Sequence, residues 1–213
     1  QNGVTPESIL LLTFTNKASK QMLERVEELT DMGAHRFLGG TFHHVGGQVL
    51  RLFGDSIGLA KSFTILDDGD SDSLLNEVIR DLDPGFFKSK ENPKAKPIKG
   101  LLSFSRNIGA SFEEVAKGRY PSNTELCSKI DSFARIYQQT KLERGLADYD
   151  DLLVYWLEVM ENNQEAAEYY QQRFSHVLVD EYQDVNSLQA RIVDKIASNH
   201  QIMAVGDDAQ CIY

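Results

Sequence analysis

The sequence contains only two cysteines, Cys127 and Cys211, and their surroundings show no metal-ligand spacing. A disulfide framework and a cysteine-based zinc site are therefore not indicated, and we expect two free thiols in a reducing compartment. The sequence also lacks an apolar run near the roughly eighteen residues of a membrane-spanning helix. Its first residues lack the basic-then-apolar layout of a signal peptide. We therefore expect a cytoplasmic protein without a membrane partner.

Positive charge is scarce. The 213 residues include 22 Lys and Arg against 32 Asp and Glu, which gives a net charge of −10. This balance argues weakly against nucleic-acid binding, because phosphate contact favours a basic surface. A groove can still be locally positive, or rich in backbone amides and aromatic rings, on an acidic body. The charge predicts weak DNA binding by this chain alone at physiological salt.

Three short apolar runs predict strands, those at residues 9–12 and 177–179 buried, and a third at 202–205. Helical spacing follows the first two. After the first run, Asn16 is the expected helix cap and Gly33 the expected stop. Strands that alternate with helices predict a parallel sheet with right-handed crossovers. The apolar stripes are Ala18, Met22, Val26 and Leu29 in the first helix, and Leu188, Ile192 and Ile196 in the second.

The middle of the chain, from about Asp67 to Gly145, has helical patterns and almost no strand pattern. Residues 88–99 between the helices are rich in Pro and Lys and are expected to form a loop, either solvated or touching duplex DNA. Gly145 is the expected stop of the last helix. The pattern favours an α/β domain (1–66 and 147–213) interrupted by a helical subdomain (67–146). The stripes are Leu74, Val78 and Leu82, then Leu126, Ile130, Phe133 and Tyr137.

The strongest chemical signal is the apolar strand 177–179 followed by Asp180 and Glu181. Ligands of open parallel sheets bind at the carboxyl ends of the strands, where these two acids are expected to lie. One acid can then hold Mg²⁺, and the other can orient and deprotonate an attacking water. The alternative is a strand that runs into an acidic helix start. The bare pattern gives the two interpretations about even weight.

Two further segments are candidates for the same edge of the sheet. Gly206 and Asp207 open a polar loop after the third strand, which would bring Gln210 near a terminal phosphate. Phe14 and Asn16 lie at the first strand-to-helix junction, where a ring can meet a nucleobase and helix amides can meet a phosphate. The pattern alone favours Phe14 in the core by roughly two to one.

Five motifs, which occur in a fixed order along the chain, resemble those of a known protein family. They are Thr13-Phe14-Thr15-Asn16-Lys17-Ala18, Thr41-Phe42-His43-His44, Asp148-Tyr149-Asp150-Asp151-Leu152, Asp180-Glu181-Tyr182-Gln183-Asp184 and Gly206-Asp207-Asp208-Ala209-Gln210-Cys211-Ile212-Tyr213. Over nearly the whole chain they resemble the UvrD/Rep family of superfamily 1 DNA helicases. The resemblance implies an incomplete parallel-sheet P-loop-NTPase (RecA-like) core with an all-helical inserted subdomain. It also implies ATP-driven movement along single-stranded DNA, 3′ to 5′, with duplex unwinding.

The resemblance also implies roles for single residues. Asp180 is similar to the family's Mg²⁺ carboxylate, Glu181 to its catalytic base and Gln210 to its γ-phosphate sensor, so ATP and Mg²⁺ are the implied cofactors. Single-stranded DNA and single/double-strand junctions are the implied partners, with accessory repair or replication proteins as further candidates. The implied contacts to single-stranded DNA are Phe14, Asn16, Thr41, His43 and Tyr213.

The sequence departs from the family in several places. Ala209 and Cys211 stand where many relatives have Asp and Ser. The phosphate-binding pattern Gly-x-x-x-x-Gly-Lys-Ser/Thr is absent, and residues 58–62 lack a Gly before Lys61. We therefore expect a fragment of a longer protein that has no ATPase activity alone, and sheet edges left exposed by a missing strand. A helicase–nuclease and a non-catalytic DNA- or protein-binding module are the alternatives.

Two other groups of polar residues have simpler explanations. His43 and His44 are adjacent, so their side chains point apart on a regular element, and we give a zinc site there roughly one chance in twenty. The acids Asp148, Asp150 and Asp151 suggest either a cation site or the cap of a helix, and the cap is favoured. That helix would carry Leu152, Leu153, Trp156, Leu157 and Met160.

Overall fold

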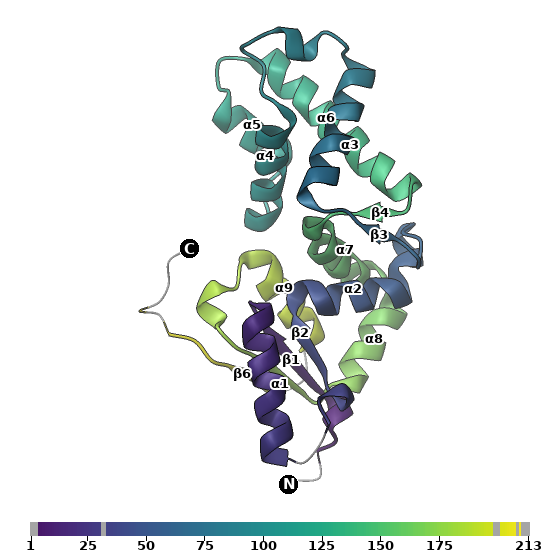
Figure 1. Cartoon of the computed structure of the whole chain (residues 1–213), viewed down its shortest axis with the longest axis vertical. Coiled ribbons are helices and arrows are strands. Elements are labelled where there is room, and N and C mark those ends of the chain that lie inside the picture. Colours follow the sequence, from purple (N-terminus) through teal and green to yellow (C-terminus); the bar gives the residue numbers. More distant parts are fainter. Residues whose placement is uncertain (1–3, 31–32, 198–200, 208, 210–213) are drawn as a thin grey trace.

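The computed structural model describes residues 4–30, 33–197, 201–207 and 209. It has two lobes, one built on a parallel sheet and one built from helices α3 to α6 (Figure 1). The helices are α1 Asn16–Thr30, α2 Phe42–Phe53, α3 Asp68–Leu82, α4 Ala95–Ile108, α5 Phe112–Arg119, α6 Thr124–Glu143, α7 Tyr149–Asn162, α8 Gln164–Arg173 and α9 Ser187–Ile196. The strands are β1 Ile9–Thr13, β2 Leu38–Thr41, β3 Thr64–Ile65, β4 Leu146–Ala147, β5 His176–Val179 and β6 Gln201–Ala204.

The larger sheet has the order β2-β1-β5-β6, and each neighbouring pair of strands is parallel. Strands β1, β5 and β6 correspond to the three predicted strands, with β6 beginning one residue before the predicted run 202–205. The predicted α/β fold with a parallel sheet is therefore confirmed. Strand β6 has exposed side chains along its whole length, with Met203 58% exposed.

Strand β2 was not predicted from the sequence. Gly39 and Gly40 lie in its middle, and glycine disfavours strands because it has no side chain to pack. The structure gives a reason for Gly39. A β-carbon there would lie 3.1 Å from Cβ of Leu11 and 3.4 Å from Cδ2 of Leu23 on α1. The small residue therefore allows α1 to pack closely against the sheet.

Alternation along the strands determines which helices cover which face. Leu10 and Leu12 of β1 are fully buried among residues of α2, α7 and α9. Leu11 points the other way, toward α1, and it is also buried. Burial on both faces is typical of a parallel sheet covered by helices. The carboxyl ends of the strands remain free of this packing and can carry polar side chains.

Helix α1 differs from the prediction in its cap and in the exposure of Leu29. Asn16 is not the cap, because the Oγ1 atom of Thr15 accepts the hydrogen bond from the Ala18 backbone N–H at 3.1 Å. Asn16 is the first helical residue, with an exposed side chain. Ala18, Met22 and Val26 of the predicted stripe are half-buried, whereas Leu29 is 72% exposed, because the last turn of α1 extends past the strands that it covers.

Helices α3 to α6 enclose a hydrophobic core of their own, separate from the core of the sheet lobe. The predicted stripe Leu126, Ile130, Phe133 and Tyr137 is buried in this core. Leu82, predicted to be part of the α3 stripe, is 48% exposed because it is the last residue of its helix. Helix α6 ends at Glu143, and Gly145 follows with φ +62°, which confirms the predicted stop.

The predicted loop 88–99 is partly helical. Helix α4 begins at Ala95, so Lys96, Pro97 and Lys99 lie in its first turns. Proline is tolerated in the first turn of a helix, where no intrahelical partner for its missing N–H exists. Lys99 is not solvated, because its ammonium group contacts Asp72 at 2.8 Å and Asp68 at 3.1 Å. Only residues 89–94 remain a loop before α4.

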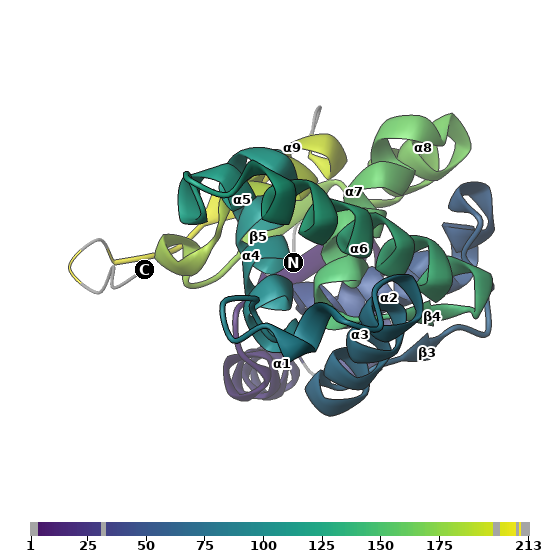
Figure 2. The ribbon, with the colours of Figure 1, turned by 90° about the horizontal axis from the view of Figure 1, so that it is seen from above.

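The chain crosses between the lobes twice, at neighbouring positions. Strand β3 on the way out and strand β4 on the way back pair in parallel, Thr64 with Leu146 and Ile65 with Ala147. Figure 2 shows these two short strands side by side. A hydrogen bond from Asn186 Nδ2 to Asn107 Oδ1, at 2.9 Å, joins the loop before α9 to α4. The division into residues 1–66, 67–146 and 147–213 remains a proposal, supported by the two separate cores.

Candidate functional site

Asp180 and Glu181 follow directly on β5, at the carboxyl edge of the sheet. The Asp180 backbone N–H still donates to the carbonyl of Leu12 on β1, at 2.9 Å. The chain then turns sharply, since Glu181 has φ +53° and ψ +45°. It is the one non-glycine residue with positive φ in the described part of the chain. A left-handed conformation at such a residue is costly and is found most often at functional sites.

Hydrogen bonds fix the two carboxylates. Asp180 Oδ1 accepts from the Glu181 backbone N–H at 3.0 Å. Glu181 Oε2 accepts from Gln183 Nε2 at 2.5 Å. Both acids are half-buried. They are therefore oriented by short local contacts while they remain accessible to a ligand.

Gln183 links this turn to the loop after β6, a role that the sequence did not predict. Its Oε1 atom accepts from the Asp207 backbone N–H at 3.0 Å. The Tyr182 backbone N–H donates to the carbonyl of Val205 at 2.9 Å. A β-carbon at Gly206 would lie 2.6 Å from Oε1 of Gln183, so the two loops approach closely only because residue 206 is glycine. Gln183 belongs to the motif that begins at Asp180, and this position was the one sign in the sequence that it could act at the site.

The structure describes only part of the loop after β6. Gln210, the predicted γ-phosphate sensor, and Tyr213, a predicted DNA contact, lie outside the described residues, as does Cys211. Cys127 is buried, and its thiol donates to the carbonyl of Tyr120 at 3.5 Å. The prediction of a free thiol is therefore confirmed for Cys127.

A second group of predicted residues meets at the ends of β1 and β2. Phe14, Asn16, Thr41 and His43 all line one pocket of about 390 Å³. Phe14 is 37% exposed, so the interpretation of this ring as a core residue is wrong. It directly follows the last residue of β1, where the chain leaves the covered part of the sheet. The remaining lining residues are Thr15, His44, Ile65, Tyr149 and Leu152.

Thr41 and His43 have defined local roles. Thr41 caps α2, and its Oγ1 atom accepts from the His44 backbone N–H at 3.2 Å. Burial lowers the pKa of His43, although the charge of Asp150 opposes the shift. The imidazole is therefore neutral at neutral pH. Its ring meets Tyr149 edge to face, with 5.8 Å between the ring centroids.

Tyr149 is a pocket residue that the sequence did not predict. It is the first residue of α7, and 56% of it is exposed. Its own motif was interpreted as a helix cap, and that interpretation is confirmed for its neighbours. The Asp151 backbone N–H donates to Asp148 Oδ1 at 3.0 Å, and the Asp148 backbone N–H donates to Asp151 Oδ2 at 2.9 Å.

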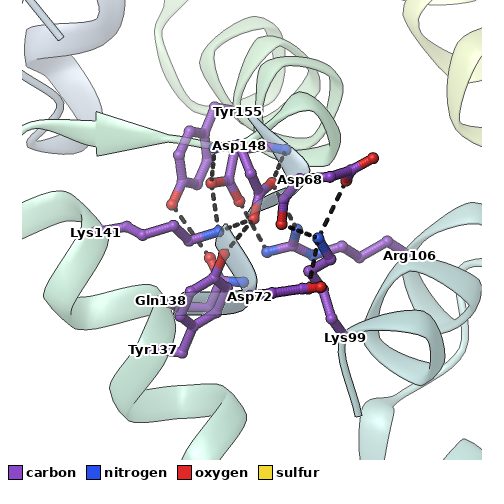
Figure 3. A network of polar contacts seen from close by, with 10 residues as sticks. Asp68, Asp72, Lys99, Arg106, Tyr137, Gln138, Lys141, Asp148 and Tyr155 are labelled. Atoms are coloured by element: carbon purple, nitrogen blue, oxygen red, sulfur yellow. Dashed lines mark hydrogen bonds and ion pairs between the residues drawn. The ribbon is translucent and has the colours of Figure 1, made fainter. Parts of the chain in front are cut away.

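The same two acids contact cations of the helical lobe (Figure 3). Lys141 from α6 contacts both carboxylates and is fully buried. Arg106 from α4 contacts Asp151 at 2.9 Å and Asp148 at 3.7 Å. Tyr137 donates its hydroxyl to Asp148 at 2.9 Å. We call Arg106, Lys141, Asp148 and Asp151 the interlobe charge cluster.

The environment shifts the two carboxylates of the interlobe charge cluster in opposite directions. Burial opposes ionisation of Asp148, but the charges of Lys141 and Arg106 outweigh it and lower the pKa of Asp148 to about 2. Burial dominates at Asp151, whose pKa is raised although both cations lie beside it. Asp148 is therefore the carboxylate whose contribution to stability is lost in acid.

This depressed pKa predicts a pH-dependent stability. The ordinary pKa of Asp is about 3.9, so Asp148 stabilises the folded state fully above that value and loses its contribution as the pH falls toward 2. We expect the difference in free energy of unfolding between the wild type and Asp148→Asn to shrink by about 2 kcal/mol between about pH 5 and pH 2. Urea titrations across this range measure it. A difference that stays constant with pH would contradict the assignment.

The described residues hold neither a cluster arranged for a metal ion nor a helix suited to a membrane. No group of three or more His, Cys, Asp or Glu residues in ranges 4–30, 33–197, 201–207 and 209 is arranged to hold a metal ion. Within the same ranges no helix is long and apolar enough to span a membrane.

Comparison with known proteins gave consistent matches over the whole chain. The profile of the UvrD/REP helicase N-terminal domain matches residues 1–213. The ATP-dependent DNA helicase PcrA of Bacillus subtilis (strain 168) is 36% identical over 219 residues, covering 100% of this chain and 28% of that protein. PcrA of Staphylococcus epidermidis is 32% identical over 219 residues, and PcrA of Staphylococcus aureus (strain Mu50) is 31% identical over 216 residues, each with the same coverage. The chain thus spans 28% of the length of these relatives.

Proposed function

The chain belongs to the UvrD/REP helicase N-terminal domain family, and from that premise we propose that it works as part of an ATP-dependent DNA helicase. One observation carries the proposal. The acids expected to act on ATP and the pocket expected to receive DNA lie at the carboxyl ends of neighbouring strands of one parallel sheet. A change at the end of β5 can therefore reach the ends of β1 and β2 over a short path.

In this proposal Glu181 is the general base of ATP hydrolysis. Its carboxylate takes a proton from the water that attacks the γ-phosphorus, and ADP and phosphate are the products. The hydrogen bond from Gln183 holds that carboxylate in place. Gln210 is proposed to contact the γ-phosphate, on the resemblance alone.

Asp180 is the residue that would hold Mg²⁺. A single carboxylate fits this ion, because Mg²⁺ keeps several waters and usually binds proteins through one or two carboxylates together with substrate phosphates. The Glu181 backbone N–H fixes Asp180 Oδ1 at 3.0 Å, which orients the carboxylate at the edge of the sheet. When bound, Mg²⁺ supplies charge neutralisation on the phosphate oxygens.

The pocket at the ends of β1 and β2 is proposed to bind single-stranded DNA. Phe14 and Tyr149 offer partly exposed aromatic rings, and base stacking on such rings tolerates any sequence. Asn16 and His43 supply polar groups for the sugar and phosphate, and Thr41 fixes the start of α2 beneath them. Tyr213 is proposed as a further contact on the resemblance alone. Movement along the strand is proposed to run 3′ to 5′.

A basic pocket of the helical lobe is proposed to meet the duplex at a single/double-strand junction. It has a volume of about 740 Å³ and lies beside α3 and the loop before α4. Its cations form no ion pairs with other residues in the described part of the chain. Phosphates can therefore bind them without breaking an internal contact. These cations are Arg80, Lys88, Lys90, Lys94 and Lys96.

The cytoplasm is the proposed compartment, with repair or replication proteins as proposed partners. The decisive experiment is ATP hydrolysis by the full-length protein with and without single-stranded DNA. Strong stimulation by DNA supports a motor. Binding of ATP without stimulation would instead favour a nucleotide-gated binding module and would contradict the DNA pocket. Degradation of DNA in the same assay would favour the helicase–nuclease alternative.

Phe14→Ala tests the pocket directly. We expect affinity for an oligothymidylate to fall by about tenfold, because one stacked base contributes roughly 1–3 kcal/mol. Fluorescence anisotropy of a labelled strand measures the affinity, and ATP binding should be unchanged. Phe104→Ala on α4 is the matched control, since Phe104 is 55% exposed and does not line the pocket. Equal affinity of wild type and Phe14→Ala would remove Phe14 from the DNA site.

A further inference from the structure

The interlobe charge cluster lies at the point where the helical lobe meets the DNA pocket. Its two acids, Asp148 and Asp151, belong to the first turn of α7 in the sheet lobe. Its two cations, Arg106 and Lys141, come from α4 and α6 of the helical lobe. Each cation contacts both acids (Figure 3). The cluster therefore fixes the first turn of α7 to two helices of the other lobe.

The charges of the cluster balance, two positive against two negative, in a nearly water-free setting. Lys141 and the Asp151 side chain are fully buried, and the Arg106 and Asp148 side chains are 12% and 11% exposed. A buried ion pair of this kind gains little stability over an apolar replacement, because desolvation of its charges is costly. The main effect of the cluster is on the relative positions of α7, α4 and α6, because buried charges accept only a narrow range of partner positions.

Tyr149 lies between the two buried acids in the sequence, yet it is 56% exposed and lines the DNA pocket. Cavities open on both sides of it, the DNA pocket of about 390 Å³ and a second cavity of about 310 Å³ toward α3 and α4. Its closest aromatic partner is His43, at 5.8 Å between ring centroids. Packing therefore holds the ring only loosely, and the backbone of residues 148–151 determines where the ring lies.

We propose that Arg106 and Lys141 are positioning residues for DNA binding, acting from the helical lobe through Asp148 and Asp151 on Tyr149. This inference rests on the proposed function. The helical lobe thereby shapes the single-strand pocket without contacting that strand. A shift of α4 or α6, such as one caused by duplex at the basic pocket, moves the backbone that carries Tyr149.

A purely structural role for the cluster makes a different prediction. The two lobes are also joined by the β3–β4 pairing and by the hydrogen bond between Asn186 and Asn107. If the cluster only holds the lobes together, its loss lowers stability and affects no DNA parameter through Tyr149. A double-mutant cycle with Tyr149 separates the two roles, because residues that act through one another give non-additive effects.

The test uses the double variant Lys141→Met with Asp148→Asn in the full-length protein. It removes one cation and one anion, so Arg106 and Asp151 remain as a balanced pair, and Asn can still cap α7. We expect the DNA concentration for half-maximal ATPase stimulation to rise by about fivefold to tenfold, while the rate at saturating DNA is retained. Tyr149→Ala should give a similar rise, and the triple variant no further rise.

Arg144→Met is the matched control, because Arg144 also lies at the end of α6 but pairs with half-exposed Glu77 within the helical lobe. Arg106→Lys is a second variant that keeps the charge and loses the two-pronged donor, with a smaller rise expected. The inference is overturned if the DNA concentration for half-maximal stimulation is unchanged in both cluster variants. It is also overturned if the triple variant shows the product of the separate effects of the double variant and of Tyr149→Ala. A wild type that responds to no DNA refutes the proposed function, and this inference with it.

Discussion

Glu181→Gln in the full-length protein is expected to reduce DNA-stimulated ATP hydrolysis by about 10²–10⁴-fold, the usual contribution of a general base. Gln keeps the size of the side chain and can still pair with Gln183, so the turn after β5 should keep its shape. It cannot accept the proton of the attacking water. ATP binding should therefore persist while turnover is lost, which equilibrium nucleotide binding and steady-state phosphate release measure separately.

Asp194→Asn provides the control for this experiment. Asp194 lies exposed on α9 in the same lobe, so its substitution changes the net charge equally without touching the site. Retention of turnover in Glu181→Gln would assign the base to another residue. The 213-residue chain alone is expected to show no turnover, since it lacks the phosphate-binding pattern. Strong turnover by the chain alone that Glu181→Gln abolishes would contradict that expectation.

Much of the site was predictable because it depends on short-range chemistry. A run of apolar residues before Asp180 predicts a buried strand, and the end of a parallel strand predicts where the acids lie. The end of the first predicted strand also placed Phe14 at the edge of the sheet, whereas Thr41 and His43 were implied by the resemblance alone. The structure brings Phe14, Asn16, Thr41 and His43 into one pocket, because the strands that carry them, β1 and β2, are neighbours in the sheet.

The features that the sequence did not predict depend on tertiary contacts. Strand β2 was missed because two adjacent glycines disfavour a strand, and the close packing of α1 that requires Gly39 is visible only in the fold. Asn is the better cap by residue type, yet the backbone places Thr15 in the capping position. Arg106 is far from Asp151 in the sequence, and no local pattern pairs them. Tyr149 was overlooked because its acidic neighbours had a sufficient explanation as caps.

The single variant Lys141→Met is expected to lower the free energy of unfolding of the 213-residue chain by about 3–5 kcal/mol, the usual cost of removing one partner of a buried ion pair. Met fills the space of the aliphatic stem, so the loss comes from charge. Asp148 and Asp151 are left with Arg106 as their remaining buried cation. Urea unfolding followed by fluorescence measures the change, because the single tryptophan, Trp156, is fully buried on α7.

Two further variants test whether the loss of stability in Lys141→Met comes from an unbalanced buried charge. Arg144→Met removes a half-exposed ion pair with Glu77 at the end of the same helix and should cost much less, because solvent screens this pair. Adding Asp148→Asn to Lys141→Met restores the balance of charge, so most of the lost stability should return. A double variant as unstable as the single one would show that Lys141 acts by packing instead. Recovery would mean that stability and pocket geometry are separable, which lets the double variant report on DNA binding in a folded protein.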